Sequence, residues 1–292
     1  MSDTTSWVLS AFADEAGNSC DEQIQALQKA GLKFLDIRNI EGFTVTALPL
    51  DTARDIKKRL DDAGIEVNMF GTPIGKIDIA DDFETDLKRL QHIGELAPIL
   101  GCNQARIFSY FNQSGQPHEE WQRESLRRLS MLRDVAKQLG LKLYHENERH
   151  IYGDLCRDVQ VIAREVRDGE NFFFIFDFDN YNQSEENVWE NWTQLREVTD
   201  AFHLKDSTAQ KEHVPSGQGN GKIREILSDA RARGWSGSLS LEPHLTHSGA
   251  VATTGPGGVA NQQYGKMPPA DSFHVAAGIA RELIEDIGAE LR

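Results

Sequence analysis

The sequence predicts an α/β protein folded as a single (β/α)8 TIM barrel, and three observations support this fold. Eight short apolar or β-branched runs recur along the chain, segments with helical periodicity lie between them, and several of those segments stop at a glycine. Strand–helix units on the order of 30 residues each predict parallel strands joined by helical crossovers. Eight such units favour closure into a barrel, and an open doubly wound sheet is the structural alternative.

The strands follow one another at nearly even spacing. The expected strands are 7–12, 33–38, 66–70, 105–110, 141–146, 172–177, 201–205 and 238–242. Between them apolar residues recur every three or four positions, as at Ile56, Leu60 and Ala63, which is typical of amphipathic helices. A glycine just after such a segment adopts the left-handed conformation that ends a helix at little cost. The predicted helix-ending glycines are Gly31, Gly64, Gly101, Gly140 and Gly234.

No linker or shift in composition divides the 292 residues, so we expect one barrel domain over 1–292. The segment 244–271, with five glycines, breaks the alternation between the last strand and the last helix. A long irregular segment inside a compact domain is usually functional or disordered. We consider an ordered lid, a subunit contact in a homo-oligomer, and a mobile surface loop.

Composition narrows the function classes. The formal charge of −15 argues against nucleic acid or an anionic membrane surface as a partner, because both attract basic patches. The three cysteines form no C-x-x-C pair, and the first residues lack the pattern of a secretory signal. No segment approaches the roughly 18 apolar residues of a membrane span. We therefore expect a cytoplasmic protein with a small-molecule substrate.

Four metal-ligating side chains occur at the carboxyl ends of consecutive expected strands. These are Glu146, Asp177, His203 and Glu242. Active sites of such barrels lie at this end of the strands. Three carboxylates and one imidazole at one mouth would repel one another unless a cation lay among them, and an oxygen-rich set with one nitrogen suits Mn²⁺ or Mg²⁺, with Co²⁺ or Zn²⁺ as alternatives. The sequence thus predicts one divalent metal site.

The sequence resembles the xylose isomerase-like barrels of the sugar phosphate isomerase/epimerase family, which includes ketose 3-epimerases, hydroxypyruvate isomerase and inosose dehydratase. The resemblance spans nearly the whole chain through F-A-D-E (12–15), T-P-I-G-K (72–76), H-E-N-E (145–148), F-D-F-D-N (176–180), H-L-K-D (203–206) and L-E-P-H-L (241–245). The family implies a metal held by the same four residues. Two departures put the substrate in doubt. F-D-F-D-N replaces the usual D-P-A-N, and the downstream arginine typical of the ketose epimerases is not evident after His203, where Lys205 or Lys211 could serve instead.

These ligands predict enolate chemistry on a sugar or sugar-like ketone. A divalent ion on the carbonyl oxygen would stabilise an enediolate, and Glu146 and Glu242 on opposite sides of it would remove and return protons. Return to the opposite face gives epimerisation, and return to the neighbouring carbon gives isomerisation. Loss of a β-leaving group would instead make the enzyme a dehydratase or a keto-glycoside lyase.

Six further residues are candidates for contacts with the substrate. They are Lys76, Arg106, His145, Asn180, Lys205 and His244. For Lys76 a salt bridge at the rim is the alternative, and for Arg106 a buried ion pair. Strand alternation points His145 away from Glu146, which would leave it an orienting role.

Two other function classes compete with the enzyme. Abasic-site DNA endonucleases share this barrel, but they need several zinc ions, more histidines and a basic face, which this acidic sequence does not offer. A non-catalytic sugar-binding barrel is the other alternative, although such a protein would be expected to lose a ligand.

Overall fold

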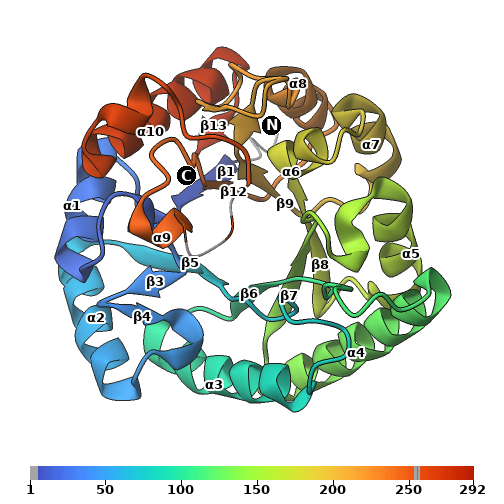
Figure 1. Ribbon diagram of the computed structural model, residues 1–292. Coiled ribbons are helices and arrows are strands. Elements are labelled where there is room, and N and C mark those ends of the chain that lie inside the picture. The colour runs from blue at the N-terminus through green and yellow to red at the C-terminus, as the bar shows by residue number, and fades with distance from the viewer. Residues whose placement is uncertain (1–5, 253–254, 256) are drawn as a thin grey trace.

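Eight parallel strands close into a barrel in the computed structural model, which describes residues 6–252, 255 and 257–292. β1 pairs with β2 on one side and with β12 on the other, so the sheet has no open edge. Figure 1 shows the strands encircled by helices. The barrel strands are β1 (Ser6–Ala11), β2 (Phe34–Ile37), β5 (Glu66–Gly71), β6 (Gln104–Ile107), β7 (Lys142–Glu146), β8 (Phe172–Asp177), β9 (Ala201–Leu204) and β12 (Ser238–Leu241). The predicted fold is confirmed.

The helices form the outer layer, because each buries one apolar face against the strands. In α2, for example, Ala53, Ile56 and Leu60 are fully buried, and the helix ends at Gly64 with a φ of 69°. The long outer helices are α1 (Cys20–Ala30), α2 (Leu50–Ala63), α3 (Glu84–Leu100), α4 (His118–Leu139), α5 (Cys156–Val166), α7 (Val188–Leu195), α8 (Ile223–Ala232) and α10 (Pro269–Asp286). No described helix is long and apolar enough to cross a membrane.

Side chains alternate between the barrel interior and the helical layer along each strand. Tyr144 and Ile175 belong to a small apolar cluster, and Glu146 and Asp177 lie two residues further along the same faces of β7 and β8. Polar side chains are also buried inside the barrel, where Asp36 accepts hydrogen bonds from Ser10 and Asn68 at 2.6 and 2.7 Å. The carboxyl ends of the strands therefore present polar side chains above a packed barrel.

Short elements surround the carboxyl-terminal mouth. They are the hairpin β3 (Asn39–Ile40) and β4 (Phe43–Thr44), the hairpin β10 (Asp206–Ser207) and β11 (His213–Val214), α6 (Phe178–Gln183), α9 (Gly249–Ala252), and the 3-10 turns η1 (Ala13–Glu15), η2 (Val45–Ala47), η3 (Tyr152–Asp154) and η4 (Tyr264–Lys266). At the other end of the barrel, β13 (Glu290–Leu291) pairs with the first residues of β1.

The segment predicted as an irregular loop over 244–271 contains α9 and η4, and α10 begins at Pro269 rather than after Asp271. The predicted end was wrong because proline fits the first turn of a helix, where its missing N–H leaves no hydrogen bond unmade. Leu245, Ala250 and Val251 are buried, so these parts of the segment pack against the barrel. Residues 253, 254 and 256 lie outside the described residues.

Candidate metal centre

Glu146, Asp177, His203 and Glu242 converge at the mouth of the barrel. Glu146 and Asp177 end β7 and β8, His203 lies in β9, and Glu242 directly follows β12. Each offers a ligand atom within 4.8 Å of those of the other three, and all four side chains are buried. Their convergence follows from the closed parallel sheet, which brings the ends of these strands to one rim.

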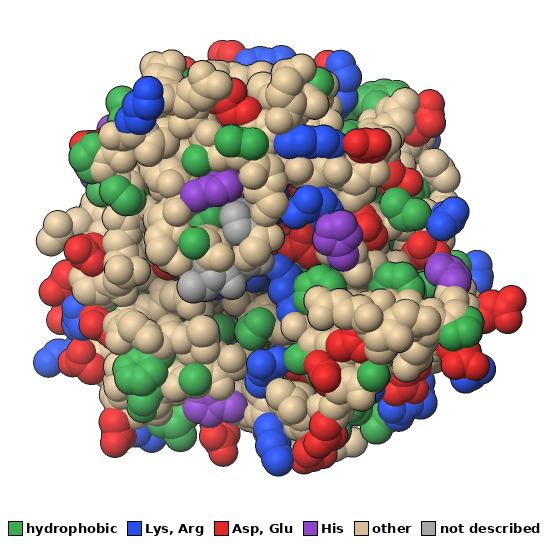
Figure 2. All heavy atoms as spheres, in the orientation of Figure 1, with side chains coloured by type: hydrophobic (Ala, Val, Ile, Leu, Met, Phe, Trp, Pro, Cys, Tyr) green, Lys and Arg blue, Asp and Glu red, His purple; other side chains and the backbone are tan. Residues whose placement is uncertain are grey.

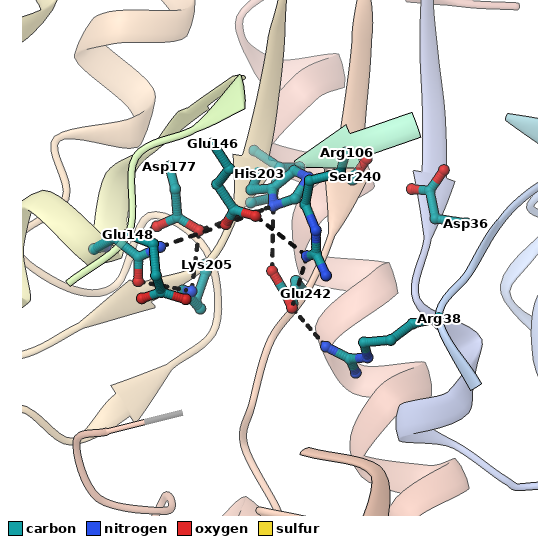
Figure 3. A network of polar contacts seen from close by, with 12 residues as sticks. Asp36, Arg38, Arg106, Glu146, Glu148, Asp177, His203, Lys205, Ser240 and Glu242 are labelled. Atoms are coloured by element: carbon teal, nitrogen blue, oxygen red, sulfur yellow. Dashed lines mark hydrogen bonds and ion pairs between the residues drawn. The ribbon is translucent and has the colours of Figure 1, made fainter. Parts of the chain in front are cut away.

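His203 lies between the two glutamates. Its Nδ1 atom is 3.0 Å from a carboxylate oxygen of Glu146, 3.2 Å from one of Glu242 and 4.0 Å from Oδ2 of Asp177 (Figure 3). Oδ1 of Asp177 accepts a hydrogen bond from the backbone N–H of Asn180 at the start of α6, which fixes the carboxylate and leaves Oδ2 toward the cluster.

Three buried cations face the acids of the cluster. Arg38 donates to Glu242 at 2.6 Å, Arg106 lies 3.2 Å from Glu146, and Lys205 lies 3.0 Å from Asp177 (Figure 3). Burial alone would raise the pKa of Glu146, but His203 and Arg106 lower it to about 2. Glu146 is thus held as a carboxylate, the form in which it binds a metal.

A divalent ion fits this set of donors. Oxygens of Glu146, Asp177 and Glu242 are buried and make no hydrogen bond with the described residues. These oxygens form ion pairs with Arg106, Lys205 and His203 at 3.0 to 3.2 Å. A carboxylate oxygen has two lone pairs, so each of them can still bind an ion. Burial raises the pKa of Asp177 well above its usual value; Lys205 opposes this rise, and the neighbouring carboxylates of Glu146 and Asp179 add to it. Three carboxylates and one imidazole are donors that Mn²⁺, Mg²⁺, Co²⁺ or Zn²⁺ accepts.

Several of the other predicted residues surround the cluster. Asn180 donates to the backbone oxygen of Asn147 at 2.9 Å and lies 3.4 Å from Glu146. Lys205 donates to Oδ1 of Asn180 at 3.0 Å in addition to its contact with Asp177. His244 has a left-handed backbone (φ 52°) that brings its ring within 3.5 Å of Glu242.

The structure places His145 away from the cluster. Its ring lies 6.4 Å from that of Phe172 and 5.5 Å from that of Phe174, on the face of β7 opposite Glu146, and it packs against Gly153. Burial lowers the pKa of His145 to about 3. Strand alternation therefore describes His145 correctly, and its placement among the substrate contacts does not fit this geometry.

Sequence reasoning did not assign the acids that hold Arg38. Asp14 accepts two hydrogen bonds from Arg38, at 2.8 and 2.9 Å, and Glu15 lies 3.6 Å from the same guanidinium. Both acids belong to the F-A-D-E motif at the end of the first strand, so the motif was visible although its role was not. Asp179, the extra acid beside the site, pairs instead with His213 of the β10–β11 hairpin at 3.3 Å.

Comparison with known proteins agrees with this fold. The model of the xylose isomerase-like TIM barrel family matches residues 24–260. Among solved structures, the IOLI protein with a bound zinc atom superposes with a TM-score of 0.74 at 15% identity, covering 96% of this chain and 99% of that one. The probable 3-DHS dehydratase AsbF from Bacillus anthracis gives 0.71 at 17% identity, covering 94% and 98%.

The 3-keto-D-glucoside 4-epimerase YcjR from E. coli gives a TM-score of 0.68 at 15% identity, covering 96% of this chain and 100% of that one. At these identities the likeness shows the fold alone. No match was found among curated proteins.

Proposed function

The chain belongs to the xylose isomerase-like TIM barrel family, and we propose that it is a divalent-metal-dependent isomerase or epimerase acting on a sugar or sugar-like ketone. The observation that supports the proposal most is the buried set of Glu146, Asp177, His203 and Glu242 at the barrel mouth. The neighbours in fold are enzymes, among them an epimerase and a probable dehydratase. One of them contains zinc, which agrees with a metal in this kind of barrel.

The ion held by these four residues would supply Lewis-acid stabilisation of the negative charge that develops on the substrate's oxygens in an enediolate. Glu146 and Glu242 approach His203 at 3.0 and 3.2 Å from β7 and β12, so their carboxylates lie on two sides of the site. One of them removes the hydrogen α to the ketone, and the other returns a proton from the other side.

The surrounding residues position the substrate and exclude water. Lys205 and Arg106 donate hydrogen bonds to its oxygens, and Asn180 and His244 make further polar contacts. The buried rings of Phe12 and Phe108 form an apolar wall at the mouth, which strengthens each electrostatic contact inside it. Loss of a β-leaving group from the same enediolate would give a dehydratase or lyase, so the reaction must be read from the product.

The decisive experiment incubates the metal-loaded protein with ketoses, ketose phosphates, inososes and 3-keto-glycosides in D₂O. We expect one of these classes to gain deuterium at the carbon next to its carbonyl and to form an epimer or isomer. A product that has lost water or an alcohol would instead identify a dehydratase or lyase. Absence of both deuterium and product across the whole panel, with the metal bound, would return the protein to the sugar-binding alternative.

A further inference from the structure

A cavity of about 390 Å³ opens beside the metal centre, between the carboxyl ends of β2, β5 and β6 and the β3–β4 hairpin. Arg106 joins the two sites, because it lines the cavity and also contacts Glu146 and Glu242. Figure 2 shows Lys and Arg side chains at the hollow in the middle of this face, on an otherwise strongly acidic protein. The polar and aromatic lining includes Arg38, Asn39, Thr44, Lys76, Arg106 and Phe108.

One wall of this cavity alternates cations with an aromatic ring. The Phe108 ring has the Arg106 guanidinium at 4.9 Å and the Lys76 ammonium at 4.3 Å from its centroid. Gly75 sets the position of Lys76: its φ is 85°, and a Cβ there would lie 2.1 Å from the carbonyl oxygen of Phe108. Only glycine allows the loop to run this close to β6, so the chain places Lys76 firmly against the ring.

The Arg106 guanidinium is short of acidic partners once the metal centre is filled. Its ion pairs are with Glu146 at 3.2 Å and Glu242 at 3.8 Å, and both carboxylates are proposed ligands whose charge the ion would neutralise. Its Nε atom is buried and makes no hydrogen bond with the described residues. A buried guanidinium is stable only when it is paired, which leaves a place for an anion.

Lys76 supplies the second half of the wall. Its ammonium group pairs with Glu148 at 2.7 Å and is only 18% exposed. An ammonium has three donors, and the contact with Glu148 uses one of them, so Lys76 can still donate into the cavity. Arg38, in contrast, is already matched by Asp14, Glu15 and Glu242, and we assign it no role in binding an anion.

We propose that this cavity binds an anionic group of the substrate, a carboxylate or a phosphate, between Arg106 and Lys76. The inference rests on the proposed function for the reacting end, which would lie between Glu146 and Glu242. The substrate would then be a ketone with an acidic group. It is either a sugar acid that carries a ketone or a ketose phosphate. Binding the charged group in the cavity would fix which carbon faces the two glutamates.

The test measures binding rather than turnover. The metal-loaded protein is titrated calorimetrically with inorganic phosphate and, separately, with acetate at constant ionic strength. Wild type should bind at least one of these anions. The anion that it binds more tightly indicates whether the anionic group of the substrate is a phosphate or a carboxylate. Lys76→Met should weaken that binding by about tenfold or more, the scale of one lost charged contact.

Lys142→Met is the matched control. Lys142 also lies over an aromatic ring, that of Phe173 at 5.8 Å, but it begins β7 at the opposite end of the barrel. Its loss should leave anion binding unchanged. Equal affinity in wild type and Lys76→Met would show that the anion binds the metal alone, which would overturn the proposal. Failure of both anions to bind wild type would overturn it as well. Anion binding that depends on Lys76 without any turnover would refute only the proposed function.

Discussion

Glu146 and Glu242 are each proposed both to bind the metal and to move protons, and glutamine separates the two roles. Glu146→Gln and Glu242→Gln keep the shape and one oxygen ligand, but an amide is not a base. We expect each variant to retain metal, more weakly than wild type, while turnover falls by about 10²-fold or more. Elemental analysis and product formation measure the two effects.

Deuterium exchange adds a finer readout to these variants. If the two acids serve opposite faces, one variant should still exchange the α-hydrogen with D₂O without forming product, and it would identify the acid that removes the first proton. Wild-type turnover in both variants, with metal retained, would contradict the two-glutamate mechanism.

His145 makes a different kind of prediction, because it lies behind the site. Burial lowers its pKa to about 3, whereas an unfolded histidine titrates near 6.5. Below pH 6.5 the unfolded chain therefore binds a proton that the folded chain does not, so His145 reduces stability as the pH falls. By pH 5 this amounts to about 2 kcal/mol.

His145→Leu should remove that loss of stability. Urea unfolding at pH 7.5 and pH 5, with a chelator present, would show a smaller decrease for the variant than for wild type. His150→Asn is the control, since His150 is exposed and should leave the decrease unchanged. The same decrease in His145→Leu and wild type would be inconsistent with a neutral, buried His145.

Asn261 is one of several residues that attach the segment after β12 to the β10–β11 hairpin, together with the backbone of Val259 and the ring of His247. The Asn261 side chain donates to the backbone oxygen of His213 at 2.9 Å and accepts from the N–H groups of Gln263 and Tyr264 at 2.9 and 2.8 Å. Asn261→Ala leaves the buried oxygen of His213 and two partly buried N–H groups without these partners and should allow local opening of the segment. Trypsin cleavage after the exposed Lys266 should then be about tenfold faster under native conditions.

Gln262→Ala is a control for that experiment, because Gln262 is exposed and its contact with Glu212 is made by the backbone. It should be cleaved at the wild-type rate. Equal cleavage of Asn261→Ala and wild type would show that other contacts hold the segment.

The positions of site residues at the ends of regular strands could be predicted from the sequence. The positions of site residues in short hairpins and irregular loops could not. Glu146, Asp177, His203 and Glu242 could be predicted to meet because parallel strands of a closed barrel end at one rim. His213 could not, since it lies in a short hairpin whose position relative to α6 is set by tertiary contacts with Asp179 and His247.

The cavity beside the candidate metal centre could not be predicted from the sequence either. Lys76 was singled out in the sequence as a candidate substrate contact at the end of T-P-I-G-K, but its position over the Phe108 ring depends on a left-handed glycine in an irregular loop. Propensities describe regular elements better than such loops, whose shape depends on what they pack against.

The candidate metal centre joins β7, β8 and β9 to β12, the strand whose pairing with β1 closes the barrel. An ion bound only by the folded chain stabilises it by about 2.7 kcal/mol at one hundred times its dissociation constant. For a chain of this size that corresponds to a rise in Tm of about 5 °C. We expect Mn²⁺, or another divalent ion that these four residues bind, to raise the Tm of wild type by about this amount. A chelator should reverse this rise in Tm.

His203→Ala should lose that response. The imidazole is the only nitrogen donor of the four-residue set, and its removal leaves three buried acids that hold a divalent ion less well. Elemental analysis of the variant should find well under one equivalent of metal per chain, and its Tm should not follow the ion. Glu282→Gln, which changes an exposed acid on α10, should behave as wild type and so exclude a general effect of charge. Should His203→Ala retain a full equivalent and the same rise in Tm, the ion binds elsewhere and the assignment of these four residues fails.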